Sequence, residues 1–78
     1  MPKLPQVSGK DTIKALVKIG FEKISQKGSH IKLRRTRGQF TDIVTVPNHR
    51  VIRRGTLRNG ILKPINISVE EFIRLLKK

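Results

Sequence analysis

Two histidines are the side chains of this sequence best suited to chemistry. His30 follows Gly28-Ser29 at the head of a basic segment, and His49 follows Pro47-Asn48. Histidine titrates near neutral pH and can serve as a general base or a general acid. Attack of a ribose 2′-hydroxyl on the neighbouring phosphorus needs a base, an acid and positive charge around the phosphorane, but no metal ion. Proton transfer at an RNA phosphate is therefore the chemistry that these residues suggest first.

Other catalytic arrangements fit the sequence poorly. A two-metal nuclease needs carboxylates that converge, whereas the acidic residues here are scattered from Asp11 to Glu71. Two histidines without a nearby acid make a poor zinc site, and the chain contains no cysteine, so we predict neither a metal nor a cofactor. Because neighbouring strand residues point to opposite faces, Ser29 is not expected to be a nucleophile for His30. We expect Ser29 to position His30 through the turn.

The charge of the chain indicates a polyanionic partner. Eighteen Lys and Arg face five Asp and Glu, which gives a net charge of +13. Nine of these cations and a single acid, Asp42, lie between Lys27 and Arg58. Such a concentration is typical of nucleic-acid binders, although an acidic protein partner is compatible with it. The predicted phosphate-binding residues are Lys27, Lys32, Arg34, Arg53, Arg54 and Arg58.

The first half of the chain is expected to form one helix and three strands. Ser8 is a good N-cap for a helix over residues 9–19, in which Ile13, Leu16 and Val17 have helical spacing. Gly20 is a natural stop. Alternating or β-branched segments with turn residues between them predict strands at 21–26, 30–36 and 40–46. These short connections imply an antiparallel meander with helices over one face.

The second half is expected to be helical. Thr56 is a plausible N-cap for a short helix that Pro64 should end or kink. The Ser68-x-x-Glu71 capping box opens a last helix that runs to Lys78. We therefore predict an α+β fold, and we expect residues 1–78 to form a single domain because the chain is so short.

The strand register brings the two histidines together. Matching the apolar faces pairs Leu33 with Val44 and Ile31 with Val46, which places His30 opposite Pro47. His49 is only two residues further along, so the two imidazoles are expected within roughly 10 Å of one another.

Several motifs in this order resemble HicA-type toxins, the small mRNA interferases also called the YcfA-like family. The matching stretches are Gly20-Phe21, Lys27-Gly28-Ser29-His30, Val46-Pro47 with His49, Gly55-Thr56-Leu57-Arg58, Ile61-Leu62-Lys63, and Ile67-Ser68 with Glu70-Glu71-Phe72. The resemblance implies a fold like a double-stranded RNA-binding domain and metal-independent RNA cleavage. It also implies catalysis by His30 and neutralisation by a HicB antitoxin that covers the active site.

The chain departs from the family pattern at two places. Ile31 stands where members often carry a second His or an Arg after the motif histidine. Asn59-Gly60 adds a residue after the Gly-Thr-Leu-Arg motif, and Pro64 replaces a residue that favours helices, so the length of this helix does not follow from the resemblance.

The function predicted from these observations is an RNA-cleaving toxin. His30 is the leading base or acid, and His49 is a weaker partner in proton transfer. Two alternatives stay open: a non-catalytic RNA-binding module, and a DNA-binding accessory protein, which here lacks a convincing recognition helix. The predicted partners are mRNA and a HicB-type antitoxin. Because no apolar leader or membrane span is evident, the predicted location is the cytoplasm.

Overall fold

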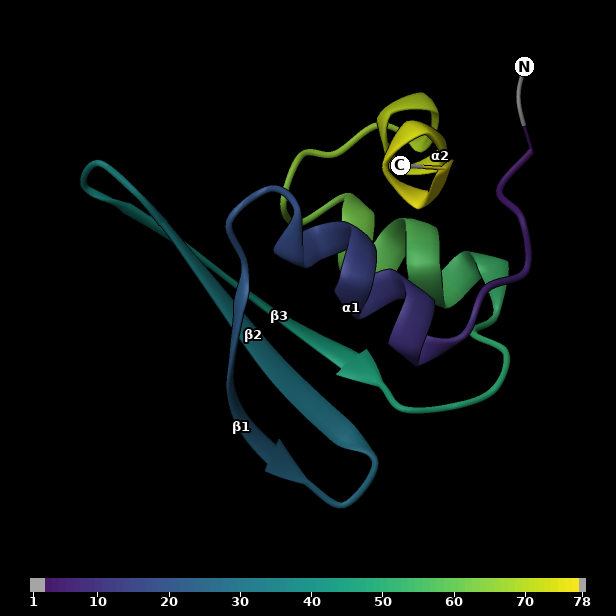
Figure 1. The fold of residues 1–78 in the computed structure, drawn as a ribbon, viewed down its shortest axis with the longest axis horizontal. Helices are drawn as coiled ribbons and strands as arrows, with labels where there is room; N and C mark the ends of the chain where they lie inside the picture. The colour runs from purple at the N-terminus through teal and green to yellow at the C-terminus, as the bar shows by residue number, and fades with distance from the viewer. Residues whose placement is uncertain (1–2, 78) are drawn as a thin grey trace.

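An antiparallel sheet and a layer of helices form the protein. The computed structural model describes residues 3–77. The elements follow the order α1 (Gly9–Val17), β1 (Glu22–Lys27), β2 (His30–Arg37), β3 (Phe40–Pro47), η1 (Thr56–Leu62) and α2 (Val69–Lys77). In Figure 1, α1, η1 and α2 all lie on one side of the sheet, whose strand order is β1-β2-β3. The predicted α+β architecture, similar to a double-stranded RNA-binding domain, is confirmed.

The central hairpin has the register that the apolar pattern predicts. Leu33 pairs with Val44, Ile31 with Val46 and His30 with Pro47. Ile31 and Leu33 are buried, whereas the residues between them are exposed, so β2 presents one apolar and one polar face. Two-residue turns close both hairpins, and each begins with a glycine at positive φ, Gly28 at 61° and Gly38 at 56°.

The first strand differs in character from the other two. β1 begins at Glu22, one residue later than predicted, because its pairing with β2 begins with Glu22 opposite Arg34, and Phe21 is buried ahead of the strand. All six residues of β1 are exposed, and a bulge interrupts its pairing with β2 between Lys23 and Ser25. β1 is therefore an edge strand that contributes little to the core.

The predicted caps form at both α-helices. Ser8 Oγ accepts the Asp11 N–H at 3.0 Å, and Ser68 Oγ accepts the Glu71 N–H at 3.0 Å. α1 ends at Val17, not at residue 19, since a turn over residues 18–20 leads to Gly20 at φ 101°. α2 is described as far as Lys77; Lys78, the predicted end, lies outside the described residues.

The segment after Gly55 is a π-helix. Gly55, and not the predicted Thr56, is its N-cap, and no side chain caps it. The Lys63 N–H donates to the Arg58 carbonyl at 2.9 Å, which is an i→i+5 bond. A π turn holds one residue more than an α turn, so it accommodates the additional residue at Asn59-Gly60. Pro64 comes directly after the C-cap Lys63. It has no backbone N–H, so it cannot donate the hydrogen bond that would continue an α-helix.

The core lies between the sheet and the helices. Its largest fully buried side chains include Phe72, Leu16, Leu33 and Leu57. Burial is confined to the helical side of the sheet, so the other face is open for a site. Among residues 3–77, no helix is both long enough and apolar enough to cross a membrane.

Candidate RNA-cleavage site

The open face of the sheet carries the head of β2. His30, Lys32 and Arg34 alternate with the buried residues of this strand and are exposed. His30 lies between Lys27 of β1 and Pro47 of β3, and Lys32 lies between Ser25 and Thr45. Rows two residues apart are separated by about 7 Å along a strand. The face therefore presents one imidazole and two ammonium groups on neighbouring rows.

Two backbone hydrogen bonds fix the loop that carries His49. The Asn48 N–H donates to the Ser29 carbonyl at 2.6 Å, so the turn before His30 holds the residue before His49. The Gly9 N–H, which opens α1, donates to the His49 carbonyl at 2.9 Å. Ser29 thus holds Asn48 through its carbonyl, and the described contacts include no hydrogen bond from its hydroxyl.

Both histidines line one hollow. We call it the loop hollow; its volume is about 610 Å³. It is lined by His30, Thr45, Pro47, His49, Val51, Ile52, Arg53 and Thr56. A second depression of about 410 Å³, the strand hollow, is lined by Ser25, Lys27, His30, Lys32 and Thr45. His30 and Thr45 belong to both hollows, so the two depressions adjoin at this pair.

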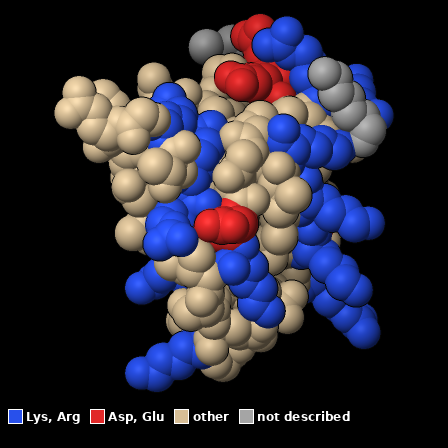
Figure 2. Space-filling model, turned by 60° about the vertical axis from the view of Figure 1, so that its left-hand side comes forward, with Lys and Arg blue, Asp and Glu red and all other residues tan. Residues whose placement is uncertain are grey.

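The electrostatic surroundings of the hollows favour an anion. Lys27, Lys32 and Arg53 line them, and no acidic residue does. Figure 2 shows the same imbalance more widely: Lys and Arg spread over much of the visible surface, and Asp and Glu form only small patches. A phosphodiester that reaches His30 therefore meets cations from β1, β2 and the loop after β3.

The remaining predicted phosphate-binding residues lie elsewhere. Arg34 is on the open face but pairs with Glu22 at 3.3 Å. The Arg54 Nε donates to the Leu4 carbonyl at 2.8 Å, which ties this side chain to the N-terminal segment. Arg58 lines a separate depression beside η1, together with Lys63. The two hollows thus bring together His30, His49, Lys27, Lys32 and Arg53, but not Arg34, Arg54 or Arg58.

Three residues that line the hollows were not predicted as site residues: Thr45, Val51 and Thr56. The register held the signal for Thr45, since the pairing of Leu33 with Val44 puts Thr45 opposite Lys32. No comparable signal existed for Val51 and Thr56, because the path of the loop over residues 48–55 depends on its contacts with Ser29, Gly9 and Val7.

Arg35 is a structural cation and not part of the open face. It is 8% exposed and faces the helical side, where its Nη2 lies 2.8 Å from Asp42 Oδ2. Arg37 Nε also reaches Asp42 Oδ2, at 3.1 Å. The hydrogen bond from Arg35, assisted by the charge of Arg37, lowers the pKa of Asp42 below its usual value. The Asp42 carboxylate therefore has a structural role, since it pairs with two arginines of the hairpin.

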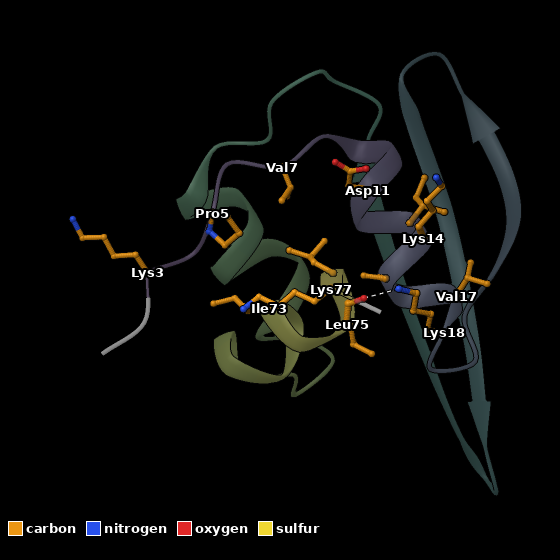
Figure 3. Close-up of a pocket in the computed structure, with 13 residues that line it drawn as sticks. Lys3, Pro5, Val7, Asp11, Lys14, Val17, Lys18, Ile73, Leu75 and Lys77 are labelled. Carbon is orange, nitrogen blue, oxygen red and sulfur yellow. Dashed lines mark hydrogen bonds between the residues drawn. The ribbon is translucent and has the colours of Figure 1, made fainter.

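A groove larger than either hollow lies away from the histidines. It occupies about 820 Å³ between the N-terminal segment, α1 and α2. Apolar side chains such as Ile73 and Leu75 line it, with lysines at its margin, as Figure 3 shows. It contains one acid, Asp11, and no histidine, so it lacks the pair of imidazoles that the loop hollow has. Residues 3–77 also contain no group of three or more His, Asp or Glu side chains that could hold a metal ion.

A comparison with protein families agrees with the motifs and the fold. The model of the HicA toxin of bacterial toxin-antitoxin matches residues 9–67 of the 78-residue chain. This chain belongs to the HicA toxin family. The match includes α1, the whole sheet, both histidines and η1 of this HicA-family chain. No curated protein and no solved structure matches it.

Proposed function

We propose that this HicA-family toxin is a metal-independent endoribonuclease that cleaves mRNA. The observation that carries the proposal is the shared loop hollow of His30 and His49, which is lined by Arg53 but by no acidic residue and adjoins the strand hollow with Lys27 and Lys32. A second imidazole beside the first allows one to accept a proton while the other donates one. Positive charge around both suits the pentacovalent phosphorane.

The proposed reaction is a transesterification. One imidazole, with His30 as the lead, takes the proton from the ribose 2′-hydroxyl as its oxygen attacks the phosphorus. The bond from phosphorus to the 5′-oxygen of the next nucleotide breaks, and the second imidazole protonates that oxygen. The products are a 2′,3′-cyclic phosphate and a 5′-hydroxyl. Lys27, Lys32 and Arg53 stabilise the negative charge on the phosphoryl oxygens.

The remaining predicted cations have a more distant role in this proposal. Arg34, Arg54 and Arg58 attract and hold flanking phosphates outside the two hollows. Ser29 acts by holding Asn48 with its carbonyl, so that His49 stays beside His30.

The proposed partner is a HicB-type antitoxin that covers the open face of the sheet. Two features support this: the family is one of toxin–antitoxin pairs, and the exposed cations would attract an acidic protein. The antitoxin should stop RNA cleavage at equimolar amounts, and RNA should slow its association with the toxin.

Cleavage of RNA by the purified protein in EDTA tests the proposal. His30→Ala should lower the rate by about 100-fold or more, because general acid–base catalysis is lost. Circular dichroism should be unchanged, because His30 is exposed. Lys14→Gln is the control, since this exposed cation lies on α1 away from the hollows. Wild-type cleavage by His30→Ala would refute the catalytic role, whereas RNA that is bound but never cut by the wild type would support the binding-module alternative.

The pH dependence of cleavage tests the role of His49. A base and an acid together give a bell-shaped profile. His49→Ala should reduce the rate by about tenfold to 100-fold and remove one limb of the bell. A profile that keeps both limbs in this variant would show that His49 is only a loop residue.

A further inference from the structure

The two hollows on the open face differ in chemistry. The strand hollow is lined only by hydroxyl, ammonium and imidazole side chains. The loop hollow adds an apolar wall of Pro47, Val51 and Ile52 to its polar groups. Its volume of about 610 Å³ lies within the range of about 300–1,000 Å³ that is usual for small-ligand sites.

Val51 is the unusual member of this wall. Its neighbour Ile52 is 2% exposed and serves the core, whereas Val51 is 52% exposed on a strongly basic surface. Val51 shares the loop hollow with Thr56, so the hollow offers a nucleobase an apolar side chain and a hydroxyl, while His49 and Arg53 serve the cleaved phosphate. Bases of single strands present apolar faces to side chains or stack on guanidinium planes, and their edges form hydrogen bonds.

Thr45 lies where the two hollows adjoin. It is exposed, faces the same side as His30 and pairs across the sheet with Lys32. A phosphodiester that crosses from one hollow to the other must pass His30 and Thr45, because these two residues line both. The Thr45 hydroxyl is therefore available to donate a hydrogen bond to the phosphate that is cleaved.

We propose that the loop hollow is a subsite for the nucleobase on one side of the cleaved bond, and that Thr45 binds the phosphate between the two nucleotides. The strand hollow takes the ribose and phosphate of the other nucleotide and leaves its base uncontacted. This inference rests on the proposed ribonuclease function and adds to it a one-sided contact with a base.

Short RNA oligomers with a single abasic ribose test the base subsite. The base is removed on the 5′ or on the 3′ side of the cleaved bond, and the 2′-hydroxyl is kept. Removal on one side should lower kcat/KM by about tenfold, and removal on the other side by less than about threefold, since only one base makes contacts. Equal effects on both sides would overturn the subsite. No cleavage of the intact oligomer would instead defeat the proposed ribonuclease function itself.

Val51→Ser connects the base effect to the loop hollow. On intact RNA the variant should lose several-fold in kcat/KM, but on the sensitive abasic oligomer it should match the wild type, because the contact is already absent. Val17→Ser is the matched control, since Val17 is 50% exposed on α1, and it should be neutral on every substrate. The same loss by Val51→Ser on intact and abasic RNA would overturn the assignment.

Thr45 is tested by its own series of variants. Thr45→Val keeps the shape but loses the hydroxyl, and it should lower kcat by about tenfold or more, with KM changed by less than about twofold. Thr45→Ser should restore most of the rate. Thr41→Val is the control, because Thr41 is exposed on the same face of β3 but lines neither hollow. A Thr45→Ser variant as slow as Thr45→Val would show a structural effect and overturn the role of the hydroxyl.

Discussion

Two cations of β2, Lys32 and Arg35, show how side chains of the same charge can have different roles. Arg35 is turned inward, bonded to Asp42 and 4.7 Å from the centre of the Phe21 ring, whereas His30 and Lys32 on the same strand face solvent. Arg35 was not predicted to be buried, although the signal was present in the sequence. The register that pairs Leu33 with Val44 also pairs Arg35 with Asp42, and strand alternation puts Arg35 on the same face as Leu33.

The lowered pKa of Asp42 predicts an acid-sensitive contribution to stability. Because its folded pKa lies below the unfolded value, the contribution is complete above about pH 4 and is lost as the pH falls through the folded pKa. Asp42→Asn should reduce the free energy of unfolding by about 2 kcal/mol at pH 7, measured by urea denaturation. The difference from the wild type should shrink as the pH falls to 2.

Glu22→Gln is the matched control for this experiment. Its partner Arg34 is half exposed, so the ion pair should contribute less than about 1 kcal/mol. A loss in Asp42→Asn that stays the same at pH 7 and pH 2 would contradict the titration of Asp42 as its cause.

Three elements hold the site: β2, the turn at Gly28-Ser29, and the loop after β3. This loop is hydrogen-bonded to the first residue of α1. Strand positions and both helix caps followed from alternation and capping residues, with errors of one or two residues at the ends. The π turn of η1 did not follow, because Leu57, Ile61 and Leu62 are buried at spacings that an α-helix also allows. The loop conformation did not follow either, since it depends on distant backbone contacts.

Gly9 is predicted to control the position of His49. The residue is buried, and a Cβ here would overlap the Pro47 carbonyl oxygen and come 3.0 Å from Asn48 Cα. Gly9→Ala should therefore displace the loop and reduce RNA cleavage by about tenfold or more, because small displacements of catalytic groups are costly. Binding of flanking phosphates should change little.

Gly55→Ala is the control for the glycine experiment. Nothing lies within 4 Å of a Cβ at this position, and its φ of −63° suits any residue. This variant should cleave like the wild type and be as stable or more stable by a few tenths to about 1 kcal/mol. Equal activity of Gly9→Ala and Gly55→Ala would show that the loop does not need the close approach.

At the scale of the whole molecule, Lys and Arg side chains are spread around the site, but only some of them line its hollows. Composition alone predicts an affinity for a polyanion, and the alternation of β2 predicted that His30, Lys32 and Arg34 share one face. Composition could not predict which Lys and Arg side chains line the hollows and which stabilise the fold. Arg54 binds the N-terminal backbone, Arg35 stabilises the hairpin, and Lys27 and Lys32 line the strand hollow.

Salt dependence should separate these roles. For single-stranded RNA, each phosphate contact contributes about 0.7 to the slope of log K against log salt. In a His30→Ala background, in which we expect cleavage to be slowed about 100-fold or more, Lys32→Gln should reduce this slope by about 0.7. Lys14→Gln should leave the slope unchanged, because Lys14 lines the groove between the helices. Equal reductions in both variants would show a diffuse charge effect instead of a phosphate contact at Lys32.

The bulge and the lysines of β1 have a consequence for how copies of this protein behave at high concentration. A free strand edge invites other chains to add on and can seed fibrils, and bulges and Lys side chains are the usual protection against this. Here the outer edge of the sheet carries Lys23 and Lys27 and is kinked between Lys23 and Ser25. The β1 edge is therefore a poor template for the addition of another strand, although β1 borders the face that is left open for a ligand.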